Sequence, residues 1–150
     1  MDGLNWNFQG PDRSDTVSFI RSFCADYKIW NDTAMTVTNG LTGSEKRAAM
    51  QDASGAYRHF LAPFVASDTM LQLIAFGSSS SFDPSRLEFT TMDDLSTNLS
   101  VGFSIMHAHL SFNDDYVAEI ESGADGELVL KQVWYLDPFP EDGQERLASL

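Results

Sequence analysis

Two histidines one residue apart are the side chains in this sequence with the clearest potential for chemistry. His107 and His109 flank Ala108, and residues two apart on a β-strand point to the same face of a sheet. Two imidazoles on one face could hold a metal ion or share a proton, although a metal site needs a third ligand, for which Glu88 or Glu119 are candidates. An acidic chain supplies such carboxylates by chance. The sequence therefore favours histidines that line or border a sheet, and we expect no metal.

Paired aspartates are the next candidates. Asp93-Asp94 and Asp114-Asp115 fall near expected strand ends, where aspartate is a common turn residue. Such pairs can perform acid-base catalysis when burial separates their protonation, but adjacent residues on a turn are usually solvated. We expect them to be recognition charges. Because strand ends and hairpins of one sheet can form a contiguous patch, the candidate partner-binding residues are Asp93, Asp94, Asp114, Asp115, Glu119 and Glu121.

Motifs of several large enzyme classes are missing from the sequence. It has no glycine-rich phosphate loop, no Gly-x-Ser-x-Gly, no cysteine pair and no His-Glu-x-x-His. The lone Cys24 falls among Phe19, Ile20 and Phe23, which predicts a buried thiol rather than a nucleophile. We expect neither an enzyme nor a cofactor.

The charge of the chain narrows the choice of partners. Its 22 acidic and 9 basic residues give a formal net charge of -13. The basic residues are scattered, with Lys46-Arg47 as the only adjacent pair, so nucleic acid and anionic membranes are poor partners. A basic protein would instead be attracted over a long range. The alternative is that the acidity serves solubility alone.

Two helices are expected first. The stripe formed by Val17, Ile20, Cys24 and Tyr27, widened by Phe19, Phe23 and Trp30, has the three-four spacing of an amphipathic helix, with Asp12 or Ser14 as its cap. A break over 37–40 precedes Thr42 and Glu45, which have the spacing of a capping box. A second helix is then expected to run to about Ala62, before Pro63.

From there the hydrophobic period changes to two, as in strands. Strands are expected over 71–76, over 86–92 around Leu87, Phe89 and Thr91, over 98–112 with both histidines on one face, over 116–121, and over 128–136 after a turn at 123–126. Short links imply an antiparallel meander. Helices followed by strands predict an α+β fold, and the tail over 137–150 is expected to pack only partly.

Length and hydropathy bear on the number of domains and on the location of the protein. A chain of 150 residues has the usual size of one domain, so residues 1–150 are expected to form a single domain. Residues 1–5 have no basic or apolar signal region, and no stretch approaches ~18 consecutive apolar residues. We expect a cytoplasmic protein that does not enter the membrane.

The order of elements resembles the nuclear transport factor 2-like fold, in which two leading helices pack on a curved antiparallel sheet to form a cone. More narrowly, the chain is similar, from about Ser14 to Asp137, to immunity proteins of that fold from bacterial polymorphic-toxin systems. The segments that carry the resemblance are Ile74-Ala75-Phe76-Gly77-Ser78, Phe82-Asp83-Pro84-Ser85-Arg86-Leu87-Glu88 and Trp134-Tyr135-Leu136-Asp137.

The resemblance implies a protein that binds one cognate toxin and blocks it by occlusion, as a monomer or a homodimer. The negative charge fits a basic toxin acting in the cytoplasm. The alternative is a small enzyme of the same fold, an isomerase, dehydratase or hydrolase, with His107, His109 and Tyr116 as acid-base groups in the cone. A small-ligand or dimerisation module is a third possibility, since fold alone does not fix function.

Overall fold

The computed structural model describes residues 6–67, 69, 71, 76–78, 80–95, 98–107, 110–123, 126–136 and 146–150, without the side chains of Asp94, Leu95 and Arg146. The chain divides into two compact units. The helical unit comprises residues 1–63 and 74–84, and the sheet unit comprises residues 64–73 and 85–150. The prediction of one domain over the whole chain stays a prediction.

The first helix, α1, spans Thr16–Thr38 and is capped by Asp15. The Asp15 carboxylate accepts a hydrogen bond from the amide of Ser18 at 2.7 Å, which satisfies an amide that has no partner within the helix. The predicted helix is confirmed, but its predicted cap is wrong. Asp12 instead accepts hydrogen bonds from the hydroxyl and amide of Ser14, and these bonds lower the pKa of Asp12 below its usual value.

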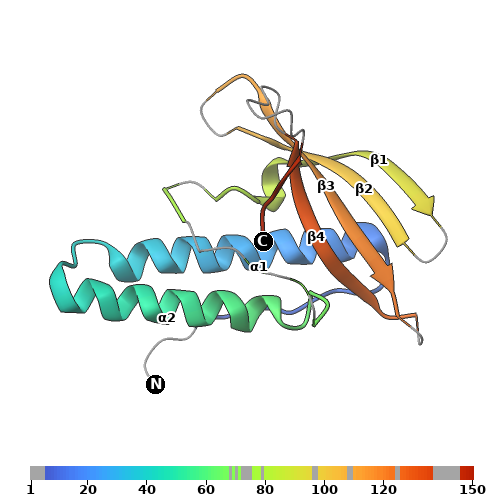
Figure 1. Cartoon of the computed structure of the whole chain (residues 1–150). Helices are drawn as coiled ribbons and strands as arrows, with labels where there is room; N and C mark the ends of the chain where they lie inside the picture. Colours follow the sequence, from blue (N-terminus) through green and yellow to red (C-terminus); the bar gives the residue numbers. More distant parts are fainter. Residues whose placement is uncertain are drawn as a thin grey trace. The chain divides into compact units, whose positions relative to one another are not determined.

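The second helix, α2, spans Gly43–Leu61 and lies antiparallel beside α1 (Figure 1). Thr42 occupies the cap position, as predicted, but its side chain makes no capping hydrogen bond. Gly43 has a φ of 60°, a left-handed conformation that differs from the regular first turn of a capping box. The capping-box prediction is therefore right about the position and wrong about the bond.

Aromatic side chains fill the contact between the helices. Trp30 of α1 is 0% exposed, donates a hydrogen bond from Nε1 to the Ala53 carbonyl at 2.9 Å, and lies 4.8 Å from the Tyr57 ring. Tyr27 lies 4.7 Å from the Phe82 ring. The predicted aromatic core of α1 is confirmed, and Cys24 is buried within it. Burial raises the pKa of the Cys24 thiol well above its ordinary value.

The segment before α1 is held by a buried carboxylate. Asp26 is 0% exposed and accepts hydrogen bonds from the amides of Gln9 at 2.8 Å and Gly10 at 2.9 Å. Phe8, in the same segment, lies 5.3 Å from the Phe60 ring. Charge-assisted bonds to backbone amides satisfy the Asp26 charge, so the segment packs on the helices as its alternating aromatics predict.

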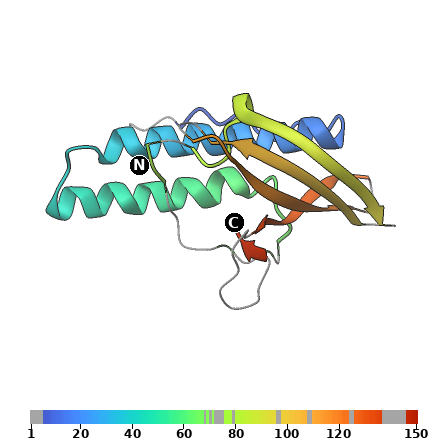
Figure 2. The same cartoon turned by 90° about the horizontal axis from the view of Figure 1, so that it is seen from above.

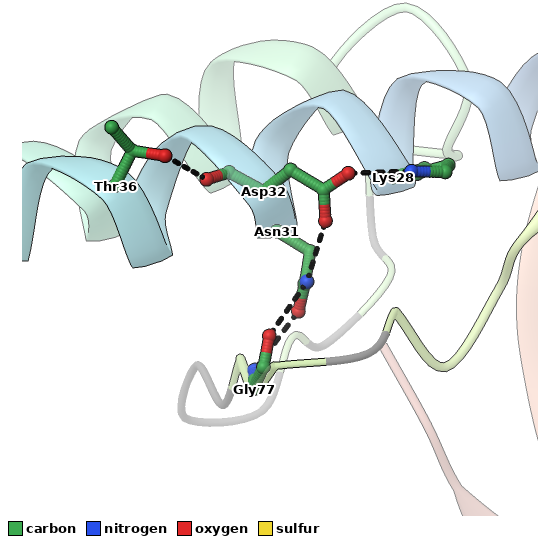
Figure 3. Close-up of polar contacts among 5 residues, drawn as sticks. All are labelled: Lys28, Asn31, Asp32, Thr36 and Gly77. Carbon is green, nitrogen blue, oxygen red and sulfur yellow. Dashed lines mark hydrogen bonds and ion pairs between the residues drawn. The ribbon is translucent and has the colours of Figure 1, made fainter. Parts of the chain in front are cut away.

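Asn31 fastens a second segment to α1 (Figure 3). Its side-chain amide donates to the Gly77 carbonyl at 2.9 Å and accepts from the Gly77 amide at 3.0 Å. The two bonds reproduce the pairing that a strand neighbour would offer. Asn31 is 2% exposed, so both bonds form largely out of water.

Replacing Asn31 with alanine should lower the free energy of unfolding by about 1–3 kcal/mol, because both polar groups of Gly77 lose their partner. Urea unfolding followed by circular dichroism measures the change. Thr36→Ala is the matched control on the same helix, since the exposed Thr36 hydroxyl donates to the Asp32 carbonyl of its own helix, and its effect should stay within about 0.5 kcal/mol. Equal effects of the two substitutions would contradict a clamp at Asn31.

The sheet unit contains five antiparallel strands in the order of the sequence. A short 3-10 turn, Pro84–Arg86, leads into β1 (Leu87–Leu95), followed by β2 (Asn98–Met106), β3 (Asn113–Ser122), β4 (Leu128–Leu136) and β5 (Arg146–Ala148). The strands curve along their length (Figures 1 and 2). The α+β class, with two N-terminal helices and a curved antiparallel meander, is confirmed.

Three details of the strands differ from the sequence predictions. The strand predicted over 98–112 ends at Met106, because the chain turns where the amide of His107 donates to the Phe112 carbonyl at 3.0 Å. A bulge between Phe89 and Thr91 interrupts β1, so Thr91 does not share a face with Leu87 and Phe89. The tail adds β5 and a fully buried Leu150. Most of the strand predicted over 71–76 lies outside the described residues.

The two faces of the sheet differ in burial. Val101, Phe103 and Ile105 of β2 are buried and pair with Ala118, Tyr116 and Asp114 of β3. We call the face that carries these three β2 side chains the inner face. The alternate residues form the outer face, where polar side chains predominate, as expected for an antiparallel sheet with one buried side.

Candidate partner-binding face

The outer face collects five carboxylates from two strands. The register aligns Glu88 of β1 with Ser104 of β2 and Asp115 of β3, and it aligns Asp93 with Ser100 and Glu119. Glu121 of β3 faces Asn98. We call these five residues the acidic face: Glu88, Asp93, Asp115, Glu119 and Glu121.

Small β2 side chains separate the two acidic strands. Ser100 and Ser104 lie between carboxylates of β1 and β3, and the Ser104 hydroxyl donates to Asp115 at 2.6 Å. Since neighbouring strands lie about 4.8 Å apart, the carboxylates across β2 are about 10 Å from each other. At this distance their potentials add at physiological ionic strength while their direct repulsion stays small.

Gly102 leaves room for side chains of β1 at the centre of the outer face. A Cβ atom there would lie 2.4 Å from the Thr91 hydroxyl and 2.8 Å from the Thr90 hydroxyl. The bulge in β1 places both threonines over the glycine. A larger residue at position 102 would have to displace them, so glycine suits this position best.

An aromatic side chain lies beside the carboxylates of β3. Trp134 of β4 pairs with Val117 of β3, and its Nε1 donates to Glu119 Oε1 at 2.6 Å. Both residues are half-buried. As the pleat requires, the neighbouring Tyr135 instead meets Tyr116, 5.6 Å away. The outer face thus combines an indole held in one orientation on β4 with negative charges on β3 and β1.

Positive charge on this face is sparse. Among the described residues, Lys131 is the basic side chain that an ion pair places here, with its ammonium 3.7 Å from Glu121. The Lys131 side chain is 34% exposed and the Glu121 side chain is 41% exposed, so solvent screens the pair strongly. The acidic face therefore retains most of its negative potential.

The structure separates the six predicted partner-binding residues. Asp93, Asp115, Glu119 and Glu121 share the acidic face. Asp114 does not, because adjacent strand residues point to opposite faces, and the contiguous patch predicted for all six is wrong there. Asp94 pairs with Leu99 in the backbone register, and its side chain lies outside the described residues. Glu88 and Trp134 were missed as members, although alternation along each strand is the signal that would place them.

The structure describes one of the two histidines, and it lies outside the strand that was predicted to carry both. His107 follows the end of β2, and its ring lies 5.1 Å from the Phe112 ring. His109 lies outside the described residues. Among the part of the chain that the structure describes, no group of three histidine, cysteine or acidic side chains could hold a metal ion.

Large apolar side chains are exposed at the turn between β2 and β3. Met106 is 55% exposed and Phe112 is 52% exposed, with Leu110 equally open. Arg86 donates from Nη1 to the Met106 carbonyl at 2.5 Å, which fixes the base of this turn. Exposed apolar groups beside a charged surface are typical of protein interaction sites.

The inner face holds a shallow pocket at its β5 edge. It has a volume of about 410 Å³ and is lined by Asp114, Tyr116, Tyr135, Leu147, Ala148 and Ser149. Tyr116 stacks on Phe103 at 5.4 Å and is 7% exposed. The enzymatic alternative named Tyr116 together with the histidines, but His107 is not among the residues that line this pocket.

No protein-family model, curated protein or solved structure matches the chain. In the described residues, neither helix has the length and apolar character needed to cross a membrane. The acidic face and the exposed turn beside it are therefore the features from which function can be argued.

Proposed function

We propose that this chain is an immunity protein that binds a cognate, basic antibacterial toxin in the cytoplasm and neutralises it by occlusion. The acidic face is the observation that carries the proposal. Its five carboxylates lie on β1 and β3 and share the outer face with an oriented tryptophan on β4. Among the described residues, one ammonium group opposes them. A net charge of -13 adds a long-range attraction for any basic partner.

The composition of this surface suits protein binding in two ways. Carboxylates spread over two strands raise the rate of encounter with a basic protein. Tryptophan is among the residues that most often contribute large binding energies when a partner covers them. Trp134 gains order from its bond to Glu119, so less side-chain entropy is lost on association.

The order of elements adds support from resemblance. Two leading helices, an antiparallel meander and a tryptophan on the fourth strand fit the immunity proteins of the nuclear transport factor 2-like fold, although membership in that family is part of the proposal. The exposed Met106, Leu110 and Phe112 would provide apolar contacts at the margin of the interface.

Co-expression tests the function directly. We expect the gene beside this one to encode a toxin domain. That domain should stop growth of a bacterial host when produced alone, and co-production of this chain should restore growth. The purified proteins should form a complex in size-exclusion chromatography. A toxin that remains active in the presence of excess folded chain would overturn the proposal.

Reversing two charges on β1 should slow association with that toxin domain. Glu88 and Asp93 are exposed and lie on the acidic face, and the double change Glu88→Lys/Asp93→Lys should lower the association rate about tenfold at low salt and flatten its salt dependence. Stopped-flow fluorescence between about 20 and 300 mM salt measures both quantities.

A control for this experiment changes charge elsewhere. Asp52→Lys in α2 paired with Glu45→Lys alters the net charge by the same amount on the helical unit. Its association rate should fall by less than about threefold. If both double variants slow association equally, net charge alone acts, and the acidic face is not the interface.

A further inference from the structure

The pocket on the inner face brings an aspartate and two tyrosines together. The register explains the arrangement, since Tyr116 of β3 pairs with Tyr135 of β4, which pairs with Leu147 of β5. Asp114 lies two residues before Tyr116 and so shares its face. At about 410 Å³, the pocket falls within the range of about 300–1,000 Å³ found for small-molecule sites.

The Asp114 carboxylate has no hydrogen-bond or ion-pair partner among the residues that the structure describes. It is half-buried, so water reaches it only partly. Asp115, its neighbour, is by contrast bonded to Ser104. Asp114 is thus the carboxylate that β3 offers to a ligand in this pocket.

The two tyrosine rings also favour a positively charged ligand. Tyr116 and Tyr135 lie 5.6 Å apart at an angle of 55°, and Phe103 stacks on Tyr116 at 5.4 Å with an angle of 18°. Ring faces carry partial negative charge and attract cations. A carboxylate beside tilted rings therefore favours a cation and repels an anion.

The other residues that line the pocket indicate what kind of cation would fit. Leu147 and Ala148 offer apolar surface, which suits an aliphatic stem. A bare metal ion fits poorly, because the described residues that line the pocket include a single carboxylate, Asp114, and a hard metal ion needs several oxygen ligands.

We propose that this pocket binds an organic cation, a guanidinium or alkylammonium group carried on an aliphatic stem. The cation is either a free amine or the arginine or lysine side chain of a protein. The site lies on the face opposite the acidic face, and the inference does not depend on the proposed function.

The test uses the full chain and three probes: agmatine as a free cation, N-acetyl-arginine amide as an arginine of a protein, and N-acetyl-citrulline amide as its uncharged counterpart. Binding is followed by NMR chemical shifts of the Tyr116 and Tyr135 rings up to about 20 mM probe, which detects dissociation constants in the millimolar range. The cationic probes should bind, and the citrulline probe should bind at least about fivefold more weakly.

Variants assign the binding to the pocket. Asp114→Asn should weaken the cationic probes about fivefold, whereas Asp115→Asn, the same change one residue away on the outer face, should alter binding by less than about twofold. Tyr135→Leu should weaken binding with the carboxylate intact. Tighter binding of agmatine indicates a free amine, and tighter binding of the arginine amide indicates a protein side chain.

Three results would overturn the inference. These are binding of neither cation to the unaltered chain, equal binding of the arginine and citrulline probes, and equal effects of Asp114→Asn and Asp115→Asn. The first two need no variant, so the inference can fail even where a substitution prevents folding.

Discussion

Replacing Trp30 with alanine should reduce the free energy of unfolding by about 3–5 kcal/mol, the range for deletion of a fully buried large aromatic side chain. Trp30 is 0% exposed and packs against rings from both helices. Its loss leaves a cavity between α1 and α2 and removes the hydrogen bond from the indole to the Ala53 carbonyl. Because whole domains are stable by about 5–15 kcal/mol, this one change should remove a large share of the stability.

Urea unfolding measured by far-ultraviolet circular dichroism tests this expectation. Trp30→Phe keeps most of the packing and should cost about half as much, which separates the cavity from the hydrogen bond. Trp6→Ala is the control, because Trp6 is half-buried and stacks on Phe8 with 6.1 Å between ring centroids. A loss below about 1 kcal/mol for Trp30→Ala would mean that the helical unit does not depend on this core.

Alkaline pH should destabilise the protein between about pH 10 and 12, through Tyr27. Burial raises the pKa of Tyr27 from 10.0 to about 12. The folded chain keeps the phenol proton where the unfolded chain releases it, so stability is complete below pH 10 and falls as pH rises through 12. At 1.36 kcal/mol per pH unit, the loss from this residue approaches about 3 kcal/mol.

Tyr57 and Cys24 should also lower the stability of the folded chain at alkaline pH. Burial, with a smaller effect of nearby Tyr27, raises the pKa of Tyr57, and burial raises that of Cys24. Unfolding midpoints in urea from pH 8 to 12, with tyrosinate absorbance at 295 nm recorded in parallel, follow both processes. In Tyr27→Phe the pH dependence should become shallower, since one of the titrating groups is gone. An unchanged slope in that variant would show that Tyr27 titrates normally in the folded chain.

The helices and the meander could be predicted from periodicity because each is set by the local spacing of apolar residues. The stripe of Phe19, Phe23, Tyr27 and Trp30 does not fit a strand, and the alternation of Val101, Phe103 and Ile105 does not fit a helix. The end of β2 could not be predicted in this way. The alternation continues formally through His107 and His109, and only the pairing of His107 with Phe112 decides where the chain turns.

The candidate site depended on information that a single strand does not contain. Alternation along β3 separates Asp114 from Asp115, Glu119 and Glu121, and this could have been read from the sequence. The face of the sheet on which Asp93 lies could not be read from the sequence. Without the bulge near Thr90, Asp93 would share the parity of Leu87 and Phe89 on the inner face. The extra residue moves it to the outer face, and sequence periodicity gives no sign of such an insertion.

The two sides of the sheet differ in how far their outer strands are hydrogen-bonded to other segments. Along β4, Leu130 bonds to Phe64 and Ala66, and Trp134 to Leu136 pair with β5, so much of this border is occupied. Within the described residues, β1 pairs with β2 alone. An exposed border strand can recruit a like strand from another molecule and begin aggregation. Two copies meeting antiparallel through β1 would set Glu88 of each against the Asp93 region of the other, and the resulting repulsion, with the bulge between, opposes uncontrolled growth from this border.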